Sequence, residues 1–183
     1  MNIQEKTLVI SKTNIVSLVQ FLVLLSAAIF APLAHSQIIT GTIVNATLFI
    51  AAVTLGLEGA IMIGILPSFF ALLAGTLPAA LMPLIPFIIL SNTLLVITFI
   101  YLKKTNYWLK AVAAVGLKFI FLSSVSFFVI NLLFKGKIAV VAATMLSWPQ
   151  LITALSGAAL AGLVLKGKGL KTYVKNRNKS ADF

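Results

Sequence analysis

Long apolar runs with almost no charge recur along the whole chain, and they constrain the fold more than any other feature. They cover residues 15–33, 41–57, 60–73, 87–102, 111–134 and 138–165. A helix needs about 20 mostly apolar residues to cross the hydrocarbon core of a bilayer, so six spans need about 120 residues. Hydrophobic residues make up 61% of the 183 and charged residues only 9%. The sequence therefore predicts an all-α polytopic membrane protein with about six transmembrane helices and no sizeable soluble domain.

We divide the chain into an N-terminal segment (1–14), a six-helix transmembrane domain (15–165) and a basic tail (166–183). The start of the chain also has the ingredients of a secretory signal peptide, namely a basic start, an apolar core and small residues near Ala34. Pro32, however, occupies a position where the cleavage pattern requires a small residue. We interpret the first run as an uncleaved span, with a cleaved segment as the alternative.

Polar and proline-rich breaks separate the runs. We predict a turn between antiparallel helices at Glu58-Gly59, because a carboxylate in mid-bilayer would cost about 3 kcal/mol or more. Proline has no backbone N–H, so residues 78–86 are predicted to form a turn, a re-entrant stretch or a kinked helix start. Tyr107 and Trp108 suit the headgroup level and mark a boundary before the fifth span.

The last apolar run, residues 138–165, is long for one span. Ser147 is a plausible N-cap and Pro149 suits a first helical turn. The final helix is therefore predicted to start near Trp148, with 138–145 as a shorter segment on the outer side.

Positive charge is distributed unevenly over the predicted loops. Eleven of the 14 Lys and Arg residues fall in the N-terminal segment, the loop after the fourth span and the C-terminal tail. Six spans place these three regions on one side, with only Lys135 and Lys137 opposite. Since cytoplasmic loops carry the excess of Lys and Arg, we expect both termini to be cytoplasmic in the cell membrane. The net charge of +11 then reflects topology and contact with anionic lipid, and we expect no nucleic-acid partner.

Lys118 is the charged residue within the fifth run. A lysine in a span either extends its ammonium to the membrane surface or pairs inside the bundle. We expect the first arrangement, in which the ammonium reaches the membrane surface.

Residue types needed for catalysis or metal binding are scarce. The chain has no cysteine, one histidine (His35) and three acidic residues, and it shows no Walker motif, paired carboxylates or Ser-His-Asp set. We therefore expect a protein that is not an enzyme and holds no metal or cofactor. Uphill transport by this chain would draw its energy from a partner.

The polar residues of the spans gather toward the predicted outer side. Since polar groups at membrane depth need partners, this one-sided set predicts an outward-facing ligand pocket. Asn45 and Asn92 would form its floor, and Trp148 would offer a stacking face. Gln37 and Gln150 would form the rim, with Thr40 nearby, under loops 35–41, 75–86 and 135–149. The alternative is that each polar side chain only joins one helix to another. The shortage of embedded charge argues against a strongly charged ligand.

Small residues spaced four apart form two stripes on which another helix can approach closely. Ala27 and Ala31 lie on the first span, and Ala154, Ala158 and Gly162 on the last. Such stripes serve either internal packing or the docking of a partner subunit.

The chain resembles the substrate-binding S component of energy-coupling factor (ECF) transporters. The resemblance covers most of residues 15–165. It is carried by the size, the six-span plan and several short motifs, namely Thr40-Gly41-Thr42-Ile43-Val44-Asn45-Ala46, Gly64-Ile65-Leu66-Pro67-Ser68, Leu77-Pro78 to Pro86-Phe87, Ser91-Asn92 and Trp148-Pro149-Gln150.

Members of that family bind a vitamin or similar micronutrient in an outward-facing pocket and associate with a transmembrane scaffold subunit and two cytoplasmic ATPases. The resemblance implies the same function here. The family's Ala-x-x-x-Ala docking motif would map onto Ala27 and Ala31, which lie toward the outer end of the first span. The alternative function is a membrane anchor or scaffold for another complex, such as a redox complex.

Overall fold

Every element in the described part of the chain is a helix. The computed structural model describes residues 12–73, 75, 79–102, 105–133 and 143–167. Its elements are α1 (Lys12–Phe30), η1 (Ala31–Ala34), α2 (Gln37–Thr54), α3 (Gly56–Leu73), η2 (Ala79–Leu84), α4 (Ile85–Tyr101), α5 (Tyr107–Leu133) and α7 (Trp148–Gly167). Within these residues, six helical stretches are long and apolar enough to cross a membrane. The predicted all-α polytopic membrane fold is confirmed.

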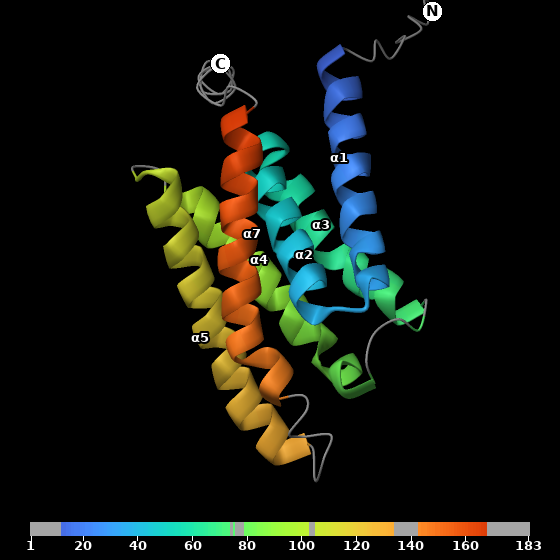
Figure 1. Ribbon diagram of the computed structural model, residues 1–183, viewed down its shortest axis with the longest axis vertical. Helices are drawn as coiled ribbons and strands as arrows, with labels where there is room; N and C mark the ends of the chain where they lie inside the picture. The colour runs from blue at the N-terminus through green and yellow to red at the C-terminus, as the bar shows by residue number, and fades with distance from the viewer. Residues whose placement is uncertain (1–11, 74, 76–78, 103–104, 134–142, 168–183) are drawn as a thin grey trace, which may run out of the picture.

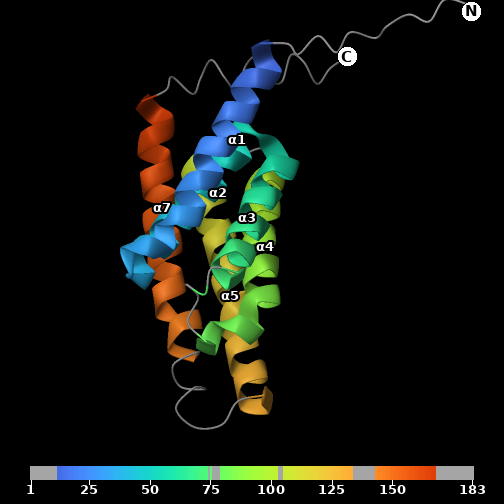
Figure 2. The ribbon, with the colours of Figure 1, turned by 90° about the vertical axis from the view of Figure 1, so that its right-hand side faces the viewer.

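The long helices run up and down the bundle in turn (Figures 1 and 2). α1 begins and α7 ends at the same end of the molecule, where α4 also meets α5. We call this the terminal end and the opposite end the distal end. An even number of spans requires this arrangement, and it agrees with the prediction that both termini share one side.

α2 and α7 approach each other closely at Gly157. A Cβ atom on Gly157 would lie 2.8 Å from the backbone nitrogen of Ala46 and 2.9 Å from the backbone oxygen of Thr42. Only glycine fits against a neighbouring backbone at that distance. Gly157 thus lets α7 pack against the middle of α2, next to Asn45.

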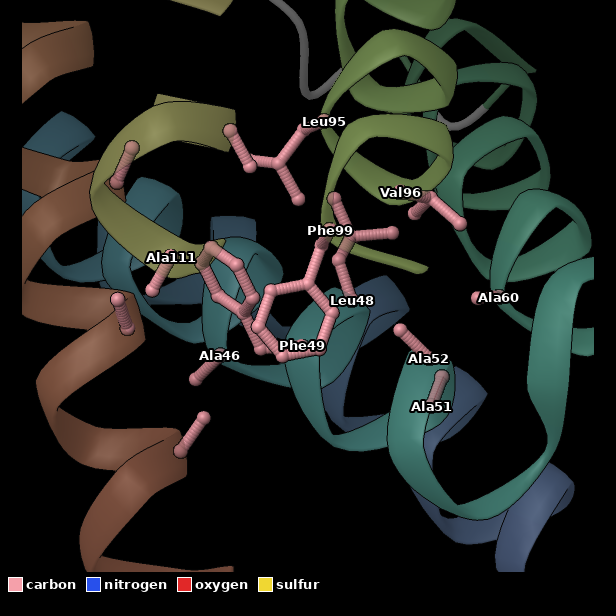
Figure 3. Packing of buried hydrophobic residues seen from close by; sticks show 14 of the residues in the cluster. Ala46, Leu48, Phe49, Ala51, Ala52, Ala60, Leu95, Val96, Phe99 and Ala111 are labelled. Carbon is pink, nitrogen blue, oxygen red and sulfur yellow. The ribbon is translucent and has the colours of Figure 1, made fainter. Parts of the chain in front are cut away.

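Three aromatic rings fill the terminal half of the bundle. Phe49 of α2 and Phe99 of α4 meet edge to face with ring centroids 5.1 Å apart, and Tyr107 of α5 lies 5.5 Å from Phe99. Figure 3 shows Phe49 and Phe99 packed together with Leu48 between the helices. The Tyr107 hydroxyl donates a hydrogen bond of 2.7 Å to the Ala158 carbonyl of α7. This aromatic cluster (Phe49, Phe99 and Tyr107) ties four helices together.

Two of the predicted helix boundaries need correction. The turn between α2 and α3 is at Leu55-Gly56, where Gly56 has a φ of 82°, and not at Glu58-Gly59. Glu58 lies in the first turn of α3, where a negative charge is favoured by the helix dipole. Tyr107 does not precede the fifth helix but starts it, since Asn106 accepts a hydrogen bond from the Leu109 N–H at 2.8 Å.

Other boundaries agree with the sequence. Of the three arrangements predicted for 78–86, the structure shows a helix start, with η2 leading into α4 and Pro86 in its first turn. α7 begins at Trp148 as predicted, although the Ser147 hydroxyl donates to the Thr144 carbonyl and does not cap the helix. Most of the predicted outer segment 138–145 lies outside the described residues, and the rest of it is helical.

The two stripes of small residues differ in how they are buried. Ala27 is exposed, whereas Ala31 is buried, so the two residues do not form the exposed docking pair that the family resemblance implies. α1 ends at Phe30, and Ala31 lies in the 3₁₀ turn η1. Ala154 and Ala158 are buried in the core, so their stripe serves internal packing.

Candidate functional site

A cavity of about 360 Å³ extends from the distal end of the bundle to its middle. Its wall includes residues from α1, α2, α3, α4, α5 and α7, so the whole bundle contributes. Five of the six predicted substrate-binding residues line it, namely Gln37, Thr40, Asn45, Asn92 and Gln150. The cavity thus brings together residues that are more than 100 positions apart in the sequence.

Three polar side chains meet at the mid-bundle end of the cavity. The Lys118 Nζ donates hydrogen bonds to the Oδ1 atoms of Asn45, at 2.7 Å, and Asn92, at 2.8 Å. Lys118 is 3% exposed, and both asparagines are equally well buried. We call these three residues the polar floor. They come from three different helices and form one hydrogen-bonded unit.

The position of Lys118 contradicts the prediction that its ammonium reaches the membrane surface. It lies 11 residues after the start of α5, which is about 16 Å along the helix axis. That distance is longer than a lysine side chain, so Nζ remains inside the bundle and takes the other arrangement, pairing with partners there.

Backbone carbonyls hold the two asparagines in place. The Asn45 amide nitrogen donates to the Gly41 carbonyl of its own helix at 2.7 Å. The Asn92 amide nitrogen crosses to the Gly64 carbonyl of α3 at 3.2 Å. With its nitrogen engaged in this way, each amide directs its oxygen to Lys118. The two asparagines predicted to form the floor lie together, joined by Lys118, whose pairing inside the bundle was the less favoured of its two predicted arrangements.

The two predicted rim residues converge on one backbone atom at the distal end. Gln37 of α2 and Gln150 of α7 both donate to the Met145 carbonyl, at 2.8 Å and 3.3 Å. Thr40 donates to the Ala31 carbonyl at 3.0 Å and fixes the start of α2 against η1. These bonds hold the segment before α7 against the cavity mouth. No described residue of η2 lines the cavity, although the sequence analysis placed loop 75–86 over it.

Trp148 lies outside the cavity and does not form the predicted stacking face. Its side chain is 67% exposed and packs against Phe119 on the outside of the bundle. Gln150 follows two residues later, and two residues turn an α-helix by about 200°. Since Gln150 faces the cavity, Trp148 faces away from it.

Between floor and rim the wall is largely apolar, with Val44, Pro67 and Ile88 among the lining residues. Polar groups at two levels and apolar contact between them are the usual composition of a small-molecule site. His35 lines the distal part. Within the described residues, no three or more His, Asp and Glu side chains lie close enough to hold a metal ion.

Comparisons with known proteins found no match. No protein-family model matches the chain, and neither a curated protein nor a solved structure is significantly similar to it.

Proposed function

We propose that the chain is a non-enzymatic, solute-binding membrane subunit that takes up a vitamin or similar micronutrient, as the ECF S components it resembles do. The observation that carries the proposal is the cavity itself, with the buried Lys118 at its inner end. An ionisable side chain inside a membrane bundle is expensive, and such residues mark ligand or ion pathways by default.

The geometry supports a site that is loaded from one side of the membrane. The cavity lies in the distal half, and the aromatic cluster fills the terminal half of the same bundle. With both termini cytoplasmic, as the distribution of Lys and Arg indicates, the cavity faces outward. A solute then enters from outside and stops at the polar floor.

Energy for uptake has to come from elsewhere in this proposal. Embedded proton relays normally use carboxylates, and the acidic residue in the described part of the chain, Glu58, lies at the terminal end of α3. We propose a transmembrane scaffold subunit with two ATPases as the partners. Because Ala31 is buried, the contact with the scaffold uses a surface other than the Ala27–Ala31 pair.

A second function is favoured by one observation. The side chains of the polar floor are hydrogen-bonded to one another, which is also how a purely structural polar cluster behaves in a bundle. In that case the chain is a membrane anchor or scaffold for another complex, and the cavity has no specific ligand.

Mass spectrometry of small molecules released from the purified protein distinguishes the two. The protein is purified in detergent and denatured, and the released compounds are quantified per chain. We expect one compound in near-stoichiometric amount, or thermal stabilisation by a member of a vitamin panel. If neither is found, the anchor function is favoured.

A matched pair of variants links the compound to the cavity. Ser68 of α3 lines the cavity, so Ser68→Phe fills part of it. Ser124 of α5 is exposed, so Ser124→Phe adds the same ring on the outside. We expect the compound to be lost from Ser68→Phe and retained by Ser124→Phe. Equal retention by both variants would place the compound elsewhere on the protein.

A further inference from the structure

We propose that the solute carries a single carboxylate and that Lys118 binds it at the polar floor. This inference rests on the proposed function and names the class of substrate for the same cavity. It is carried by the position, hydrogen bonds and charge of Lys118.

Lys118 has an unused donor that faces the cavity. An ammonium group has three N–H donors and no acceptor. Two of them are used by the Asn45 and Asn92 oxygens. In the described part of the chain the third N–H has no protein acceptor, and Lys118 is among the residues that line the cavity. A ligand oxygen placed at the floor completes the coordination of Nζ.

A protonated Lys118 has no counter-charge at the floor. The two asparagine carbonyls are neutral, so they accept hydrogen bonds from Lys118 without cancelling its charge. Glu58 is the acidic residue in the described part of the chain, and it lies at the terminal end, in the first turn of α3. A buried ammonium without a counter-charge is unfavourable, and an anionic ligand group supplies the missing charge.

The single positive charge of the Lys118 ammonium favours an anion with a single negative charge. One ammonium balances one negative charge, as in a carboxylate, whereas a phosphate monoester carries about −1.5 to −2 at pH 7. The remainder of the wall, with Val44, Pro67 and Ile88, suits a neutral and mainly apolar body. A small monocarboxylic acid fits both parts. The sequence argued only against a strongly charged ligand, and a single carboxylate is compatible with that expectation.

The test compares each acid with its neutral counterpart on the full chain in detergent. The probes are nicotinate and nicotinamide, biotin and biotinamide, and pantothenate and panthenol, together with any compound released in the mass-spectrometry experiment. Thermal melting is measured with each probe. We expect the acid of at least one pair, or a released acid, to raise the melting temperature and its neutral counterpart to have little effect.

Lys118→Gln removes the charge and keeps a group that can donate to Asn45 and Asn92. Lys166→Gln removes a charge from an exposed position in the last turn of α7 and serves as the matched control. We expect the acid to bind Lys118→Gln weaker by on the order of 30-fold or more, and Lys166→Gln as it binds the wild type. If Lys118→Gln does not fold, the comparison of acid and neutral probes on the wild type still tests whether the site selects a carboxylate.

The outcomes separate the two proposals. A bound compound that has no acidic group, or an acid that binds Lys118→Gln and the wild type equally, overturns the carboxylate inference and leaves the solute-binding function in place. A wild type that releases no compound and responds to no probe contradicts both.

Discussion

The two halves of this bundle are built on the same faces of the same three helices, yet between those faces one half is packed with aromatic rings and the other contains a cavity. α2 carries Asn45 and, four residues on, Phe49. α4 carries Asn92 and, seven residues on, Phe99. Spacings of four and seven residues return to the same side of an α-helix. The terminal half is therefore filled by rings, and the distal half has a cavity above polar side chains.

α5 follows the same plan in the opposite direction. Tyr107 joins the aromatic cluster, and Lys118, 11 residues or about three turns later, joins the polar floor. Along three helix faces, the change from aromatic to polar side chains thus separates the packed aromatic cluster from the candidate binding site. We therefore expect the aromatic cluster to determine the stability of the bundle and the polar floor to determine which solute binds.

The largest effect on stability is expected from a substitution in the aromatic cluster. Phe49→Ala removes a fully buried ring and is expected to lower the free energy of unfolding by about 3 kcal/mol. The loss comes from the cavity and the missing van der Waals contacts, since lipid is as apolar as the core. The preference for acid over neutral probes should stay unchanged.

Unfolding in graded SDS measures the loss of stability in Phe49→Ala, and Phe69→Ala, at a half-exposed position, is the control. A changed preference without lost stability would break the comparison.

Gly157→Ala affects both halves, because it forces α7 away from α2 beside Asn45. We expect it to cost about 2 kcal/mol of stability and to weaken ligand binding as the polar floor shifts. Gly116→Ala is the matched control, since a Cβ atom there meets no atom within 4 Å. Comparison of the two variants by SDS unfolding and probe binding tests whether the close approach of α2 and α7 positions the floor. Equal behaviour of the two variants would contradict this.

Tyr107→Phe separates the contribution of ring packing in the aromatic cluster from that of its hydrogen bond. It keeps the ring and removes the hydrogen bond to the Ala158 carbonyl. The expected loss is about 1 kcal/mol, as for a typical buried hydrogen bond, with ligand binding unaffected. The same unfolding assay measures it, and a loss as large as that of Phe49→Ala would mean that the hydrogen bond, and not ring packing, holds the four helices.

The smallest effect is expected at Trp148, on the outside of the cavity. Trp148→Ala should leave the affinity for the bound acid within about twofold, whereas Gln150→Ala should weaken it several-fold by freeing the segment at Met145. Equilibrium binding of the same acid to the two variants makes the comparison. A large loss in Trp148→Ala alone would restore the stacking role that the sequence predicts.

Much of the fold was predictable because the bilayer limits the choices. Runs of about 20 apolar residues in water-free surroundings become helices. The prolines at 78–86 left three arrangements open, of which the structure shows the helix start. The turn before α3 was placed at Glu58-Gly59 because of the charge on Glu58. The chain turns at Gly56, with a φ of 82°, and Glu58 lies in the first turn of α3.

The site was predicted in part, for a physical reason. Asn45, Asn92, Gln37 and Gln150 are polar groups in apolar runs, and such groups must find partners. Lys118 was assigned to the membrane surface in preference to pairing inside the bundle, although its position 11 residues beyond Tyr107 already placed it near mid-membrane. Trp148 was assigned to the cavity because its side chain suits stacking. Residues two apart on a helix face nearly opposite directions, however, so Trp148 and Gln150 cannot both face the cavity.

Native mass spectrometry of the intact protein in detergent tests the central claim most directly, because it reports binding and chain mass together. The account predicts a mass increment of one small acid per chain in the wild type and in Phe49→Ala. It predicts no increment in Ser68→Phe and a strongly reduced one in Lys118→Gln. A wild type without any bound compound, or the same increment in all four proteins, would contradict the assignment of the distal half as a binding site.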